Sequence, residues 1–246
     1  MSRLFLVCTF LFGMMLASSG VVTAQETATD VDIAAIGESV LAADPELMVT
    51  GLESPPDDAS IPEGFINPPS GVAANAEIVD PLTGTFENFE GAIGNVSHGF
   101  DTDPTVVPGL ISSGILTYIV TDGPIDENAL NQIEEQLGQG LNAATPAAEA
   151  TSEGATPSAS GPTTEGQVER VEVGGADAIV TSVSAELGAV NGTIQIVAVP
   201  VGNTLVIGTV VVADQGEVDP EQVLGFAEAL TLAGVEHIGT VAEGAQ

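Results

Sequence analysis

The chain has almost no basic residues. Among its 246 residues there is no lysine, and the two arginines, Arg3 and Arg170, face 35 aspartates and glutamates, which gives a formal net charge of −33. A charge of this sign repels phosphate backbones and anionic lipid, so the composition argues against nucleic-acid and membrane-surface partners. Without lysine, Schiff-base catalysis and the lysine-dependent phosphate-binding loop are excluded outright.

Residues with catalytic side chains are equally scarce. Cys8 is the only cysteine, there are two histidines, His98 and His237, and there is no tryptophan. Two histidines without an H-E-x-x-H pattern do not build a histidine-based zinc site. Ser97 precedes His98, but neighbours on a strand face opposite ways, so the two do not form a catalytic pair. We therefore predict no catalytic residues and no bound cofactor, and the interpretation leans against an enzyme.

Residues 1–24 have the three-part pattern of a secretory signal peptide. A basic start at Arg3 is followed by the uncharged apolar run Leu4–Ala17 and by small residues ending at Ala24. An uncleaved anchor is the alternative, because about 20 apolar residues can span a bilayer, but residues 18–25 are small and polar, which favours cleavage. Cys8 lies inside the apolar run, which argues against lipidation. We predict a secreted or extracytoplasmic protein whose mature form lacks cysteine.

The N-terminal half, residues 25–142, is predicted to alternate between helices and strands. We expect a helix over 31–43 capped by Asp30, a connector over 53–70 that contains five prolines, and a helix after Asp126. That second helix has an apolar stripe of Leu130, Ile133, Leu137 and Leu141. Strands are expected over 72–79, 92–100 and 111–121.

Residues 143–166 separate the two halves. This segment contains no Val, Ile, Leu, Met or aromatic residue. A segment that buries no apolar surface cannot offset the entropy lost on ordering, so we predict a disordered Ala/Thr/Ser/Pro linker.

The C-terminal half, residues 167–246, is predicted to be a strand meander closed by a helix. Strands are expected over 167–173, 178–187, 194–201 and 204–213, with turns at Gly174-Gly175, Asn191-Gly192 and Gly202-Asn203. Asp219 is expected to cap a helix with Pro220 in its first position. The run 204–213 is nearly all apolar, so both its faces should be covered, either by layers of the same chain or by a dimer. Pro200 places its strand at an edge or a bulge.

Together these elements predict an α+β fold, an antiparallel sheet with helices packed on its faces and a low-complexity linker inserted. The second half also resembles the PsbP-like fold of small exported bacterial proteins, through Val171–Ala178, the hairpin 194–213 and the helix from Asp219. The stretch Ile61–Phe65 resembles the entry of such domains. The resemblance implies a sheet with helices on both faces and accessory or binding roles more often than catalysis.

Three groups of residues are candidates for a site. Asp101 and Asp103 offer carboxylate oxygens to calcium, with a simple turn before Pro104 as the alternative. Phe86 and Phe89 lie in an acidic segment, where they either dock a partner or anchor the core. Arg170 either clamps an anionic ligand or forms an ion pair beside Glu169 and Glu172.

We therefore expect an exported acidic protein with a non-catalytic binding or accessory role. A calcium-stabilised surface module and a carboxylate-dependent hydrolase are the alternatives. The partner is expected to be a second copy of the chain or another extracellular protein.

The acid bias predicts a dependence of stability on salt if it is an adaptation to saline or acidic surroundings, because salt screens the repulsion between carboxylates. The melting temperature at neutral pH, measured by circular dichroism, should then rise with sodium chloride. Equal melting temperatures at low and high salt would instead identify a solubility bias.

Overall fold

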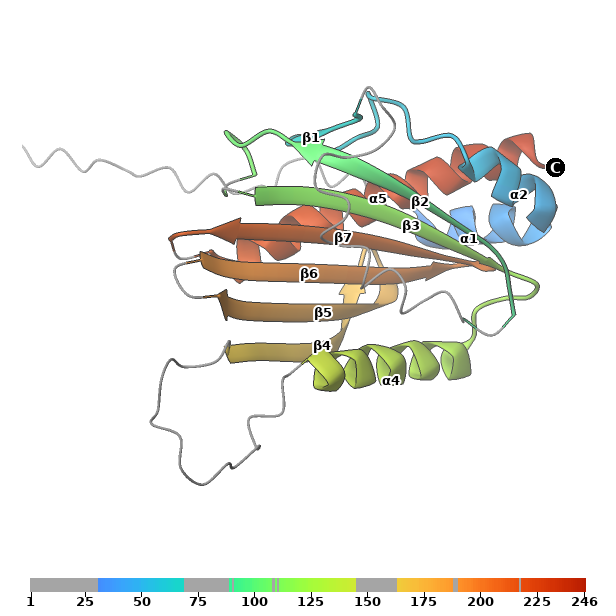
Figure 1. Ribbon diagram of the computed structural model, residues 1–246. Coiled ribbons are helices and arrows are strands. Elements are labelled where there is room, and N and C mark those ends of the chain that lie inside the picture. Colours follow the sequence, from blue (N-terminus) through green and yellow to red (C-terminus); the bar gives the residue numbers. More distant parts are fainter. Residues whose placement is uncertain are drawn as a thin grey trace, which may run out of the picture.

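The fold is built on one antiparallel sheet of seven strands, in the order β1-β2-β3-β7-β6-β5-β4 (Figure 1). The computed structural model describes residues 31–68, 89, 91–107, 109, 111–144, 163–187, 190–216 and 218–246. The strands are β1 (Phe65–Ile66), β2 (Ala92–Thr102), β3 (Ile111–Thr121), β4 (Thr163–Val173), β5 (Ala176–Leu187), β6 (Val190–Val201) and β7 (Thr204–Asp214). The sheet curls into a half-barrel. Both halves of the chain contribute to it, because β7 pairs with β3.

Helices cover both faces of this sheet. They are α1 (Ile33–Ala42), α2 (Pro45–Leu52), α4 (Glu127–Ala144) and α5 (Pro220–Gly244). Residues of α1, α2 and α5 share one apolar core with one face of the sheet, the α5 face, and α4 packs on the opposite one, the α4 face. The predicted α+β class, an antiparallel sheet with helices on its faces, is confirmed.

Each of the four described helices begins at an aspartate. The carboxylates of Asp32, Asp44, Asp126 and Asp219 accept hydrogen bonds from main-chain N–H groups of the first helical turn, at 2.9 to 3.3 Å. A helix N-terminus attracts negative charge and leaves N–H groups without partners, so aspartate is favoured there on both counts. The predicted caps Asp126 and Asp219 are confirmed. The cap expected at Asp30 is wrong, since Asp32 reaches the N–H of Ala35 and α1 begins at Ile33.

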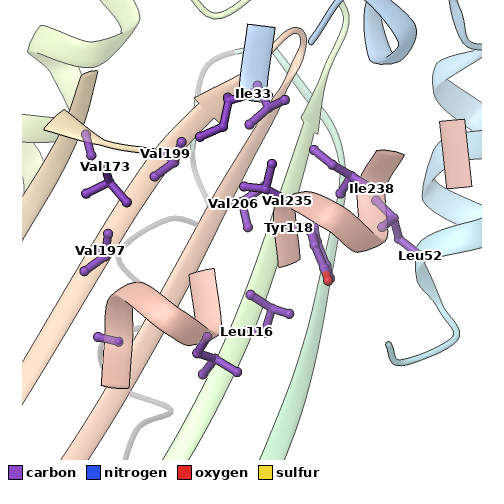
Figure 2. Close-up of a cluster of buried hydrophobic side chains, with 14 of the residues drawn as sticks. Ile33, Leu52, Leu116, Tyr118, Val173, Val197, Val199, Val206, Val235 and Ile238 are labelled. Atoms are coloured by element: carbon purple, nitrogen blue, oxygen red, sulfur yellow. The ribbon is translucent and has the colours of Figure 1, made fainter. Parts of the chain in front are cut away.

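Strand β7 is buried on both sides. Val206, Val210 and Val212 belong to the core on the α5 face, and Leu205 and Ile207 belong to the core on the α4 face. Figure 2 shows Val206 beside Leu116 and Tyr118 of β3 and beside Val235 of α5. The prediction that this run is covered on both faces is confirmed, and helices of the same chain provide the cover.

Helix α5 lies directly on the sheet because Gly208 has no side chain. A Cβ at Gly208 would lie 2.7 Å from the carbonyl oxygen of Ala227 and would also clash with the hydroxyl of Thr231. The Thr231 hydroxyl donates to the Ala227 carbonyl at 2.7 Å and lies 3.3 Å from the carbonyl oxygen of Val197. On the helix side, Gly234 makes a matching close approach to Leu116 and Val206.

Two turn predictions met different outcomes. The turn at Gly202-Asn203 is confirmed, with a positive φ of 63° at Gly202. The turn at Asn191-Gly192 is wrong, because both residues lie inside β6 and Leu187 already pairs with Val190. The Asn191 amide instead donates to the carbonyl of Gly216 at 2.9 Å, so this side chain fixes the segment after β7 rather than a hairpin.

The positions of Pro200 and Pro45 have a structural explanation. The pairing of β6 with β5 stops at Ala198, so Pro200 faces no strand on that side and its missing N–H costs no ladder bond. Pro45 is the first residue of α2, which begins soon after α1 ends at Ala42.

Of the predicted linker, residues 143–144 belong to α4 and residues 163–166 to β4. Its residues 145–162, the predicted strand 72–79 and the predicted signal 1–24 lie outside the described residues.

Substituting Gly208 tests the contact between α5 and the sheet. We expect Gly208→Ala to lower the free energy of unfolding by about 1–3 kcal/mol, the usual cost of overpacking a core. Gly225→Ala is the matched control, because a Cβ at Gly225 meets no atom within 4 Å. It should raise stability by up to about 1 kcal/mol, since alanine is the better helix former. Urea denaturation measures both, and an unchanged Gly208→Ala variant would contradict the contact.

Candidate functional site

A hollow of about 470 Å³ lies between α1 and the tips of two hairpins. One wall is a face of α1 along most of its length, and the other is formed by the β4–β5 turn and by the end of β6 with the turn that follows it. The lining residues are Val31, Asp32, Ile33, Ala34, Gly37, Glu38, Leu41, Gly174, Gly175, Ala176, Pro200, Val201 and Gly202. We call it the α1 hollow.

Glycines at both hairpin turns shape the α1 hollow. Gly174, Gly175 and Gly202 have φ values of 58°, 82° and 63°, a left-handed conformation that favours glycine. A Cβ at Gly202 would lie 2.7 Å from the carbonyl oxygen of Gly37, so α1 touches this turn main chain to main chain. At Gly175 a Cβ would meet nothing within 4 Å, so the β4–β5 turn leaves open space there.

The lining of the α1 hollow is mainly apolar side chain and main chain. Leu41 is 51% exposed, and it is one of four large apolar residues that are exposed in the described ranges. The lining contains two carboxylates, Asp32 and Glu38. Asp32 caps the N-terminus of α1. Glu38 is therefore the only charged residue of the lining that does not also cap a helix. The surface therefore suits a neutral or basic ligand with an apolar part.

The two histidines, which are remote in sequence, come together around Tyr118. The rings of His98 and Tyr118 are 6.1 Å apart, and those of Tyr118 and His237 are 5.8 Å apart. His98 Nε2 donates to the carbonyl of Leu52 at 2.8 Å, and His237 Nε2 donates to that of Ser54 at 3.1 Å. These carbonyls belong to the C-terminal end of α2 and the segment just after it, where helical carbonyls lack partners. The imidazoles thus hold α2 against β2 and α5.

The surroundings of this histidine pair favour neutral rings. Burial lowers the pKa of both His98 and His237, and it outweighs the carbonyl hydrogen bonds, which raise the pKa. Repulsion from His98 lowers the pKa of His237 further, while Asp57 raises it. The Tyr118 hydroxyl is buried without a hydrogen-bond partner, and burial raises the pKa of Tyr118 well above its usual value. Figure 2 shows Tyr118 beside Ile238 and Leu52 in the core.

Ser97 points away from His98, as the alternation along a strand predicts. The Ser97 hydroxyl lies 2.9 Å from that of Thr117 on β3, whereas His98 packs beside Tyr118. The nearest serine in sequence is therefore on the other face of the sheet from the imidazole.

Arg170 joins β4 to α4. Its guanidinium donates to Glu127 at 2.5 Å, to Asn131 at 2.6 Å and to Glu134 at 2.9 Å, three residues along one stripe of α4. The ion pair was expected within β4, beside Glu169 and Glu172, and that location is wrong. Glu169, the adjacent residue, alternates to the other face of the sheet. With three partners, the guanidinium is engaged in holding α4 rather than open to an anion.

The remaining candidates fall in a turn and in the core. The Asp103 carboxylate accepts from the main-chain N–H of Thr105 at 2.8 Å and from its hydroxyl at 2.7 Å, and these bonds lower the pKa of Asp103. Asp101 pairs with Ile66 of β1. Phe89 is 6% exposed and packs in the core under α4. Phe86 lies outside the described residues.

Within the described ranges, no three His, Cys, Asp or Glu side chains lie close enough to hold a metal ion. None of the helices described is long and apolar enough to cross a membrane. No family model, curated protein or solved structure matches the chain. The PsbP-like resemblance therefore stays a prediction. Neither the α1 hollow nor the histidine pair was anticipated, because both join segments that no local pattern links.

The histidine pair predicts a loss of stability in mild acid. Unfolded histidines bind protons near pH 6.5, whereas the folded pKa values are lower. The contribution of the pair is thus complete above that pH and is lost as the pH falls through the folded pKa values. The double variant H98Q/H237Q keeps a donor at each position without a titratable group, so its melting temperature should fall less between about pH 7 and pH 5. Parallel curves for the two proteins would contradict this effect.

Comparing the wild type with the H98Q/H237Q variant also removes the effect of the other titratable groups. Burial raises the pKa of Glu228, which adds stability as the pH falls, but both proteins carry that residue.

Proposed function

We propose that the chain is a non-catalytic binding or accessory protein that works outside the cytoplasm and uses the α1 hollow as its contact surface. The observation that supports the proposal is the lining of the hollow, where apolar side chains and the main chain of two turns surround a single uncommitted carboxylate, Glu38. Binding surfaces of this kind are typically apolar with a few polar groups that fix orientation.

The hydrogen bonds of the chemically versatile side chains support a binding role over a catalytic one. His98 and His237 donate to main-chain carbonyls after α2, and Arg170 donates to three side chains of α4. Each of these groups therefore stabilises the fold through its own contacts. A general base or an anion clamp needs at least one such group directed at a ligand.

The charge of the chain restricts the ligand. With a net charge of −33, the surface repels anions at distances below the screening length of about 8 Å at physiological salt. Glu38 in the lining of the hollow then favours a basic group on the ligand. We expect a short apolar peptide segment that carries a lysine or arginine, presented by another extracellular protein.

Export is the second part of the proposal and rests on residues 1–24. The basic start, the uncharged run and the small residues before Gln25 are the sequence features that support it. Removal of this segment would take away Arg3 and leave Arg170 as the last cation of the chain.

Two neighbouring alanines on α1 provide a matched test of the hollow. Ala34 lines it, whereas Ala35, which is also exposed, does not. Immobilised wild-type protein should retain a specific partner from the extracellular fraction of the producing cells. We expect Ala34→Trp to lose that partner, because the indole fills the hollow, and Ala35→Trp to keep it.

Quantitative mass spectrometry of the retained proteins compares the three samples. No partner at any salt concentration, or equal retention by both variants, would argue against the hollow. Turnover of any substrate class by the wild-type chain would overturn the non-catalytic role.

A further inference from the structure

Among the described residues, one edge of the sheet has no neighbouring strand along most of its length. β1 pairs only with Asp101 and Thr102 at the end of β2, and no strand among the described residues pairs with the rest of that side. The register between β2 and β3 shifts between Ala92 and Gly94, so the regular part of this edge is Gly94–Phe100. We call Gly94–Phe100 the β2 edge. It is about 24 Å long at the usual rise per residue.

The β2 edge carries none of the charges or prolines that normally prevent strands from pairing. Its sequence, GNVSHGF, contains no Asp, Glu, Lys, Arg or Pro, although acidic residues are abundant elsewhere in the chain. Asn95 and Ser97 are exposed, and burial lowers the pKa of His98, which favours its uncharged form. Unprotected edges of this kind are templates for the pairing of another strand.

The opposite edge of the sheet is protected. β4 carries Glu165, Glu169 and Glu172, and Arg170 ties it to α4. The two edges of one sheet thus differ in charge, and the uncharged one belongs to a chain with a net charge of −33. Repulsion between carboxylates disfavours any contact between two copies that brings acidic side chains together. The β2 edge has no acidic residue, so pairing of two such edges places no carboxylates opposite each other.

We propose that the β2 edge pairs with the same edge of a second copy of the chain, antiparallel, across a two-fold axis at Ser97. Antiparallel self-pairing is closed and symmetric, as most homodimers are. Ser97 is the centre of the regular run, so it lies opposite its own counterpart, with Val96 opposite His98 and Asn95 opposite Gly99. Every pair in this register is free of formal charge, and none brings two bulky side chains together.

The size of the contact indicates a reversible dimer. A seven-residue edge pairs the main chains of two copies through hydrogen bonds. The area that it buries is much smaller than the roughly 1,200–2,000 Å² that stable interfaces bury. Repulsion between the two acidic chains weakens it further at low salt. The dimer should therefore dissociate on dilution and strengthen as sodium chloride is added.

Charge placed at Ser97 tests both the interface and its register. Ser97→Glu and Ser97→Lys each bring like charges face to face across the axis, so each should raise the dissociation constant at least about fivefold. Ser97→Lys is the sharper variant, because it weakens the dimer although it lowers the total negative charge of the chain. A one-to-one mixture of the two variants should restore association, since glutamate then lies opposite lysine.

Sedimentation velocity over a range of protein concentrations measures each dissociation constant, and a tag on one variant identifies the mixed dimer. Ser97→Ala controls for the lost contact with Thr117, and Gln167→Lys places the same charge on β4; both should associate like the wild type. Circular dichroism verifies that every variant is folded.

A wild-type chain that stays monomeric at every concentration and salt would overturn the proposal. So would a dimer that Ser97→Glu and Ser97→Lys leave unchanged, because the contact would then lie elsewhere. The inference is independent of the α1 hollow, since Ala34→Trp removes the proposed ligand site and leaves the β2 edge intact.

Discussion

The scarcity of cations is the constraint on which the rest of the structure depends. A chain with 2 basic and 35 acidic residues cannot be held together by ion pairs, so its carboxylates must be placed where negative charge is tolerated. The helix N-termini meet this need, and four aspartates occupy them. At the other end of α2, two imidazoles donate to carbonyls after the helix, a role that lysine or arginine often takes. The single ion-pair network described, at Arg170, joins the one helix that packs alone on its face.

With charge confined in this way, cohesion comes from apolar burial around β7. Its alternate residues enter two separate cores, and helix α5 approaches closely because Gly208 and Gly234 lack side chains at the contact. Small residues at that contact allow main chain to lie on main chain, which increases the number of atoms in van der Waals contact. Cys8 is the only cysteine of the chain, so no disulfide can form within it, and this burial has to supply the cohesion.

Much of this fold could be predicted from local sequence patterns. The strands over 111–121 and 204–213 and the caps at Asp126 and Asp219 follow from periodicity and capping chemistry, which act over a few residues. Local patterns could not show that Asn191-Gly192 lies inside a strand instead of forming a turn. The side-chain amide of Asn191 donates to the carbonyl of Gly216, which is remote in sequence. The partners of Arg170 were missed for the same reason, since α4 reaches β4 only after the chain has folded. The α1 hollow and the histidine pair likewise depend on tertiary packing.

The distribution of charge also explains why the two proposed contact surfaces lie where they do. At physiological salt, charges more than about 8 Å apart are largely screened. The charges next to a contact therefore matter more than the net charge of the whole chain. The α1 hollow has one carboxylate without a structural duty, and the β2 edge has none. On a surface where acids are frequent and cations nearly absent, patches without charge are the places where another molecule can come close without burying an unpaired carboxylate. The acid bias thereby leaves few positions where another molecule can make close contact.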